Sequence, residues 1–215
     1  MSLGTAVRHG VADTARTFRE IYREPARRPL RRFPAAYLLY EDGVNTVILF
    51  SAIFAEKSLG FGFTEIIALF MVVQLTALLG SALWARTTDV RGPKRVVTAT
   101  LVQWIAVTAL AFAVQSKWQF WVVGVLAGTG LGAIQAASRT FMATLIPAGR
   151  EAEFFGFYSM VGKTGAILGP LVFGGVSLAL GGNQRVAIVT VGAFFVFGLI
   201  LLRRVDAGGP TVVAA

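Results

Sequence analysis

The chain has 215 residues, of which 55% are hydrophobic and only 14% are charged, and its mean hydropathy is +0.69. About a quarter of the residues in an ordinary soluble domain are charged. The composition therefore excludes a soluble globular domain, a disordered segment and a collagen-like rod. The chain has no cysteine and a single histidine, His9. Disulfide frameworks and cysteine nucleophiles are excluded, and we expect no metal site and no cofactor.

Six apolar runs are long enough to cross a bilayer, since a membrane-spanning helix needs about 20 apolar residues. In chain order they cover roughly 35–54, 64–84, 95–115, 118–146, 154–179 and 186–202. The runs do not alternate as barrel strands do, and an open sheet is not stable in hydrocarbon, so helices are predicted. The fold class is therefore all-α, with a six-helix transmembrane domain over residues 35–204.

The segments on either side of this domain differ from it in composition. Residues 1–34 are basic and lack the apolar run of a signal peptide. Their apolar side chains recur at helical spacing at Val7, Val11, Ala15, Phe18 and Tyr22. This pattern predicts an amphipathic helix on the cytoplasmic lipid surface, with a solvated basic linker as the alternative. Three prolines are expected to end that helix before the first span: Pro25, Pro29 and Pro34. Residues 205–215 are predicted to form a flexible tail.

The basic residues are distributed unequally between the two ends of the predicted spans. One end receives eight arginines that precede residue 35, together with Arg86, Arg91, Lys94, Arg95, Arg139, Arg150, Arg203 and Arg204. The other end receives only Lys57, Lys117 and Arg185, and Lys163 lies inside a span. By the positive-inside rule, both termini are cytoplasmic. The net charge of +9 is then typical of a multi-pass membrane protein, and no nucleic-acid partner is expected.

Polar side chains interrupt four of the apolar runs, where they are costly and usually face a bundle interior or an aqueous path. In the first run, Tyr37, Glu41 and Asn45 share one helical face because they are four residues apart. In the fifth run, Ser159 and Lys163 have the same spacing. The candidate residues for binding a solute or a proton are Glu41, Asp42, Asn45, Gln74, Gln135 and Lys163.

Asp42 and Lys163 lie at similar depths, roughly 11 Å and roughly 13 Å from the cytoplasmic side at 1.5 Å per helical residue. We therefore expect an acid of the first run, Asp42 or Glu41, to pair with Lys163 across the bundle. Two interpretations are open: a substrate or proton site that includes Glu41, or a structural ion pair that fixes helix packing. Arg139 lies nearer the cytoplasmic face, where we expect it to snorkel or to pair with Asp89 and to act in gating or in structure.

Glycines recur at every fourth position in two of the runs. The positions are Gly124, Gly128 and Gly132 in the fourth run, and Gly165 and Gly169 in the fifth. Such faces of small residues let two helix backbones approach closely. A proline follows Gly169 directly, which predicts a kink in the fifth span.

Several segments resemble a known family of membrane proteins. The loop Asp89-Val90-Arg91-Gly92-Pro93-Lys94-Arg95 resembles the cytoplasmic signature of the major facilitator superfamily, although Val90 and Pro93 stand where that signature has basic residues. Residues 33–46 (FPAAYLLYEDGVNT) and 145–158 (LIPAGREAEFFGFY) are similar to its vacuole-effluxer-like family, as are Gln135 and its neighbours, Gly162-Lys163 and residues 168–170. That family is related to autophagy-linked vacuolar amino-acid exporters.

The resemblance implies that the chain is the second six-helix half of a twelve-helix transporter, built from two inverted three-helix repeats. A small polar solute such as an amino acid then binds between two halves and moves by alternating access. In that picture Asp42, Asn45 and Gln135 contact the solute. The expected gating residues are Asp89, Gly92, Lys94, Arg95 and Arg139. The expected partners are the lipid bilayer and a second half, either a separate chain or another copy.

Two other classes of function compete with a transporter. A non-transporting membrane scaffold or a truncated transporter fragment is the main alternative. An enzyme is disfavoured, because the sequence contains no His-Glu-x-x-His motif, no Gly-x-Ser-x-Gly motif and no phosphate loop that ends in Gly-Lys-Ser or Gly-Lys-Thr. The expected location is the bacterial plasma membrane.

Overall fold

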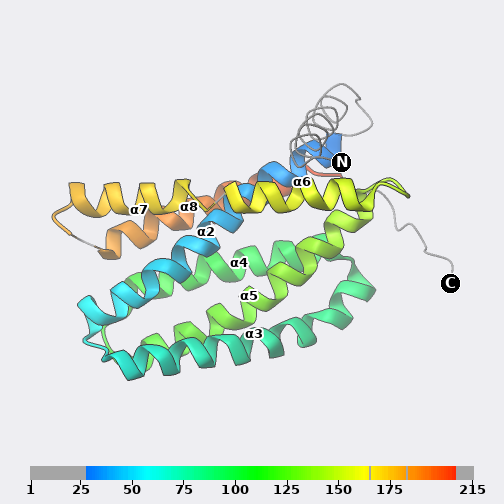
Figure 1. Ribbon diagram of the computed structural model, residues 1–215. Helices are drawn as coiled ribbons and strands as arrows, with labels where there is room; N and C mark the ends of the chain where they lie inside the picture. The colour runs from blue at the N-terminus through cyan, green and yellow to red at the C-terminus, as the bar shows by residue number, and fades with distance from the viewer. Residues whose placement is uncertain (1–27, 165, 183, 207–215) are drawn as a thin grey trace, which may run out of the picture.

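A computed structural model of the chain describes residues 28–164, 166–182 and 184–206. The predicted amphipathic segment before residue 28, most of the predicted tail and Gly165 lie outside the described residues. Within the described part, all regular structure is helical, and six segments are long and apolar enough to cross a membrane (Figure 1). The prediction of an all-α, six-span protein is therefore confirmed.

The helices follow the predicted runs, with one difference in the fifth. In chain order they are α2 (Arg28–Leu59), α3 (Phe63–Arg91), α4 (Pro93–Ala113), α5 (Lys117–Leu145), α6 (Glu151–Thr164), α7 (Leu168–Ala179) and α8 (Gln184–Arg203). The fifth predicted span is thus divided into two helices, α6 and α7, which follow one another along the same side of the molecule (Figure 1).

The first helix begins earlier than the predicted span, and this overturns one expectation about prolines. Pro29 lies in the first turn of α2, where its missing N–H would have had no intrahelical partner. Pro34 lies inside the helix. Packing maintains the helix there, because Phe33 is fully buried and its ring lies edge-on to Phe141 and parallel to that of Tyr158. Pro29 and Pro34 therefore do not form a break before the first span.

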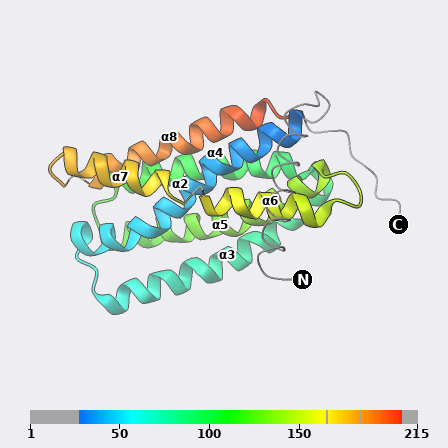
Figure 2. The same ribbon diagram turned by 45° about the horizontal axis from the view of Figure 1, so that its top comes forward.

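The helices form two groups that pack against each other (Figure 2). One group contains α3, α4 and α5, and the other contains α2, α6, α7 and α8. Across the groups, α4 packs on α8 and α2 packs on α5. The first span therefore packs with the last two spans rather than with its two successors in the chain.

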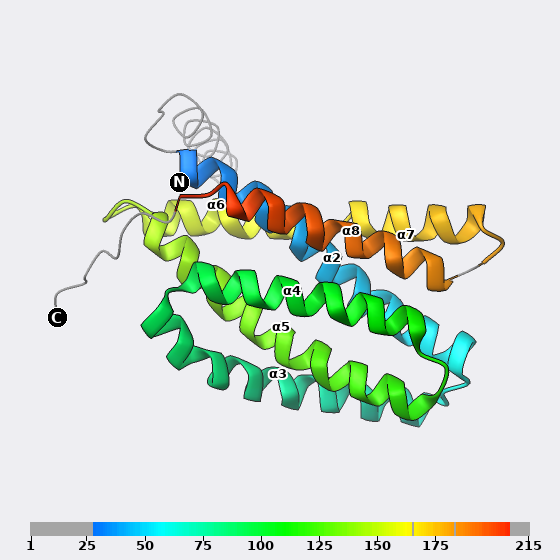
Figure 3. The same cartoon turned by 180° about the vertical axis from the view of Figure 1, so that it is seen from behind.

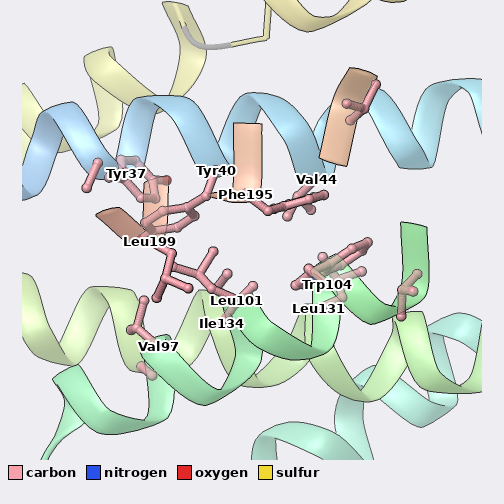
Figure 4. Packing of buried hydrophobic residues seen from close by; sticks show 14 of the residues in the cluster. Tyr37, Tyr40, Val44, Val97, Leu101, Trp104, Leu131, Ile134, Phe195 and Leu199 are labelled. Atoms are coloured by element: carbon pink, nitrogen blue, oxygen red, sulfur yellow. The ribbon is translucent and has the colours of Figure 1, made fainter. Parts of the chain in front are cut away.

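The core of the protein lies between the two groups. Figure 4 shows the large buried side chains that meet there, contributed by α2, α4, α5 and α8. The rings of Trp104 and Phe195 stack with centroids 5.3 Å apart. Tyr40 is fully buried, and its hydroxyl lies 2.7 Å from that of Ser138. This bond links α2 to α5 and satisfies two polar groups in an apolar setting.

Glycines set the close approach of α3 to α5. A Cβ atom added to Gly132 would overlap the carbonyl oxygen of Ala77, and one added to Gly80 would overlap that of Thr129. A Cβ on Gly128 would likewise overlap the Thr76 hydroxyl. The predicted small-residue face on the fourth span is therefore confirmed as a helix-packing surface.

The first two carbonyls after the end of α8 are held by two basic side chains from other helices. Arg32, near the start of α2, donates to the carbonyl of Arg204 at 2.7 Å. Lys94, in the first turn of α4, donates to the carbonyl of Val205 at 2.5 Å. Cations at a helix C-terminus satisfy free carbonyls and oppose the helix dipole. At the opposite end of the bundle, Arg185 donates to the carbonyls of Phe112 and Val114 at the end of α4.

Candidate functional site

A polar cavity of about 680 Å³ lies between α2, α5 and α6. Its size falls within the range of small-molecule sites, about 300–1,000 Å³. The residues around it are Tyr37, Glu41, Asn45, Arg139, Phe155, Tyr158, Ser159, Gly162, Lys163 and Ala166. Three charged side chains at one cavity are unusual within a membrane-spanning bundle, and they mark it as the candidate site.

Helical spacing explains which side chains of α2 reach the cavity. Tyr37, Glu41 and Asn45 all line it, as their predicted common face requires. The ring of Tyr37 stacks on that of Tyr158 from α6, with centroids 4.1 Å apart. A Cβ on Gly162 would lie 2.8 Å from the Tyr37 hydroxyl oxygen, so the glycine makes room for this ring. The aromatic pair therefore forms an apolar wall beside the charged groups.

The charges of the cavity come from three helices. Glu41 belongs to α2, Arg139 to α5 and Lys163 to α6. Among the described residues, no ion pair or hydrogen bond engages these three side chains. Two cations and one carboxylate thus face a common space, where they are free to interact with a ligand that carries both signs of charge.

Asp42 occupies a different place from the one that the sequence predicts. Its side chain is fully buried, and Oδ2 accepts a hydrogen bond from the backbone N–H of Gly169 at 2.7 Å. Consecutive residues of a helix project about 100° apart, so Asp42 points toward α7 while Glu41 points into the cavity. The expected Asp42–Lys163 ion pair is absent from the described part of the chain. That prediction is wrong, and Asp42 does not line the cavity.

The break between α6 and α7 is stabilised from α2. Pro170 lies in the first turn of α7 and lacks the N–H that would continue the helix from α6. The carboxylate of Asp42 supplies an acceptor and a negative charge at the start of α7, both of which favour a helix N-terminus. A Cβ on Gly169 would overlap the hydroxyl of Thr46. The predicted kink is therefore a complete break, located where the backbone of α7 packs closely on α2.

The other predicted binding residues lie away from this cavity. Gln135 is exposed on α5, and Gln74 is exposed on α3, where it borders a small apolar cavity of about 100 Å³. Within the described residues, no group of three or more acidic, histidine or cysteine side chains is placed to hold a metal ion. The polar side chains around the larger cavity are those of Tyr37, Glu41, Asn45, Arg139, Tyr158, Ser159 and Lys163.

Four of the five predicted gating residues lie near the junction of α3 and α4. Gly92 alone separates the two helices, and its φ of +83° falls in the region that favours glycine. Asp89 and Arg95 are exposed, whereas Lys94 is bound to α8. In the part of the chain that the structure describes, Asp89 makes no ion pair with Arg139. Arg139 lines the cavity instead.

Three residues of α6 at the cavity were not among the predicted binding or gating residues. Phe155, Tyr158 and Gly162 all line the cavity. A signal for them exists, since Phe155 and Gly162 lie four residues before and three residues after Ser159, on the same helical face. The stacking of Tyr158 on Tyr37 depends on how α2 and α6 pack, which the spacing does not specify.

Known proteins resemble this chain over most of its length. A family model described as "Vacuole effluxer Atg22 like" matches residues 2–210. The MFS-type transporter YxiO of Bacillus subtilis is 32% identical over 175 residues, which cover 81% of this chain and 40% of YxiO. Autophagy-related protein 22-1 of Aspergillus niger is 25% identical over 203 residues, covering 87% of this chain and 33% of that protein. The chain thus spans about two fifths or less of the length of these relatives.

Proposed function

The chain belongs to the Atg22-like vacuole effluxer family, and we propose that it is the C-terminal half of a secondary transporter that moves a small polar solute by alternating access. In this proposal, the cavity between α2, α5 and α6 is one wall of the solute path, and a second six-helix half supplies the other. The feature that carries the proposal is the group of Glu41, Arg139 and Lys163 around one cavity, with no hydrogen bond or ion pair to their side chains among the described residues.

The chemistry of the cavity suits an amino acid. The carboxylate of Glu41 complements an ammonium group, while Arg139 and Lys163 complement a carboxylate. Asn45 and Ser159 offer neutral hydrogen-bonding groups, and the stacked rings of the aromatic wall offer an apolar surface to a side chain. Binding at the interface of two halves is the arrangement that alternating access requires.

The proposal also includes an orientation and a partner. The excess of arginine and lysine at one end of the spans supports an orientation with both termini in the cytoplasm, and the location we propose is the bacterial plasma membrane. The partner is a separate six-helix chain or a second copy of this chain. We propose the segment 1–34 as a cytoplasmic linker, 35–204 as the transmembrane domain, and 205–215 as a tail. Asp89, Gly92 and Arg95 keep their proposed role at the cytoplasmic gate, and the chain has no enzymatic role of its own.

Replacing Lys163 by methionine should lower uptake of radiolabelled amino acids into proteoliposomes by at least ~10-fold, because a charge-assisted contact to the solute carboxylate is lost. Glu41→Gln should have a similar effect through the ammonium group. The matched control is Lys57→Met, which removes an exposed lysine from the last turn of α2 and should leave uptake unchanged. Unchanged uptake in both cavity variants would overturn the proposed site.

The alternative class, a non-transporting scaffold or a transporter fragment, predicts a different assembly. The native mass of the purified chain in lipid nanodiscs separates the two. A dimer, or a one-to-one complex with another six-span chain, supports a path with two walls. A strict monomer that shows no uptake supports the scaffold or the fragment.

A further inference from the structure

Three arginines lie at the cytoplasmic ends of α4 and α8, where these two helices meet. Arg95 lies in the first turn of α4, Arg203 ends α8, and Arg204 follows it. All three are exposed, and among the described residues no hydrogen bond or ion pair engages their side chains. The bond from Lys94 to the carbonyl of Val205 ties the two helix ends together. In the view of Figure 3, α8 and α4 lie side by side and face the viewer, whereas α6 lies behind them.

Apolar side chains continue from these arginines along both helices. Val102 lies seven residues after Arg95, on the same face of α4, and is 52% exposed. On α8, Ile200 and Val196 lie three and seven residues before Arg203 and are 42% and 40% exposed. The surface therefore has a basic end at the level of the lipid headgroups and an apolar remainder at the level of the acyl chains.

We propose that this surface binds one anionic phospholipid, with its phosphate on Arg95, Arg203 and Arg204 and its acyl chains along α4 and α8. Guanidinium groups match phosphate geometry with paired hydrogen bonds, and basic sites between membrane helices on the cytoplasmic side suit acidic headgroups. Independently of the solute cavity, this assigns a binding site to the opposite side of the bundle.

The backbone at the end of α8 is compatible with an anion there. A helix C-terminus carries partial negative charge that repels phosphate. Here the carbonyls of Arg204 and Val205 are already occupied by Arg32 and Lys94, which bring two positive charges to the same place. Asp206 is the acidic residue nearest in sequence, and it is outnumbered by these cations. The cluster therefore presents net positive charge despite its position at a helix C-terminus.

The test measures lipid binding to the delipidated full-length chain by native mass spectrometry. Phosphatidylglycerol is titrated against phosphatidylcholine, which has no net charge. We expect at least a ~10-fold preference for phosphatidylglycerol, and we expect R95Q/R203Q to abolish it. The charge-matched control is R86Q/R91Q, which removes two exposed arginines from the end of α3 and should retain the preference. R95K/R203K keeps the positive charge but loses the paired hydrogen bonds, so it should retain only part of the preference.

Each other outcome would overturn the proposal. Equal losses in R95Q/R203Q and R86Q/R91Q would mean that the lipid responds to overall charge rather than to this surface. No preference in the unmodified chain would mean that the arginines face lipid without selecting it. Displacement of phosphatidylglycerol by water-soluble glycerol phosphate at equal concentration would mean a phosphate site without a role for the acyl chains.

Discussion

Replacing Gly132 by alanine should lower the free energy of unfolding by about 3 kcal/mol, because the added methyl group overlaps the backbone of α3. The obstacle is the carbonyl oxygen of Ala77, which belongs to a helix backbone and has no rotamer by which to move aside. Gly80→Ala should have an effect of similar size from the opposite helix, since its Cβ meets the backbone of Thr129. Unfolding in mixed detergent and dodecyl sulfate micelles measures the change.

A glycine in α7 provides the control, because alanine at this position should not lower the free energy of unfolding. Gly175 lies in α7, and a Cβ added there would meet nothing within 4 Å. Gly175→Ala should leave stability unchanged or raise it by about 0.5–1 kcal/mol, because alanine favours a helix. If Gly132→Ala and Gly175→Ala shift unfolding equally, the account of the α3–α5 crossing fails.

Replacing Asp42 by alanine should destabilise the start of α7 by about 2 kcal/mol, because the Gly169 N–H loses its acceptor in a buried setting. Asp42→Asn should cost less, since the amide oxygen still accepts a hydrogen bond. The measurement is hydrogen exchange at the Gly169 amide, together with global unfolding. The exchange rate should rise by at least ~10-fold in the alanine variant and less in the asparagine variant.

The neighbouring acid offers the matched control. Glu41 faces the cavity and makes no hydrogen bond or ion pair among the described residues. Glu41→Ala should therefore leave exchange at Gly169 unchanged while it lowers uptake. An Asp42→Ala variant with normal exchange but no uptake would restore Asp42 to the solute site and contradict its role as a cap.

Helical periodicity was sufficient to predict one face of the cavity. Tyr37, Glu41 and Asn45 share that face because their spacing fixes their direction relative to each other. The periodicity could not decide which face of α2 is turned to the cavity. Glu41 on one face and Asp42 on the next are both carboxylates within one apolar run. Which face is turned to the cavity depends on where α6 and α7 pack. Asp42 is directed toward α7, where it accepts the hydrogen bond of the buried Gly169 N–H.

Hydrogen bonds between residues far apart in the chain could not be predicted from the sequence either. Lys94 belongs to a loop that resembles a gating signature, yet its side chain caps α8, 111 residues further along the chain. Arg32 makes the equivalent bond across 172 residues. Composition and hydropathy identified the six spans because each span depends on its own residues alone, whereas such bonds depend on the packing of several helices.

The proposed solute path requires that Glu41, Asn45, Arg139 and Lys163 face water rather than lipid, and cysteine accessibility tests this most directly. The chain has no cysteine, so single-cysteine variants have no background reaction. In membranes, Asn45→Cys should react with a membrane-impermeant methanethiosulfonate at least ~10-fold faster than Val102→Cys on the exposed face of α4, since only a hydrated thiol forms the reactive thiolate. Equal, slow reaction at both positions would contradict an aqueous cavity and, with it, the proposed transport path.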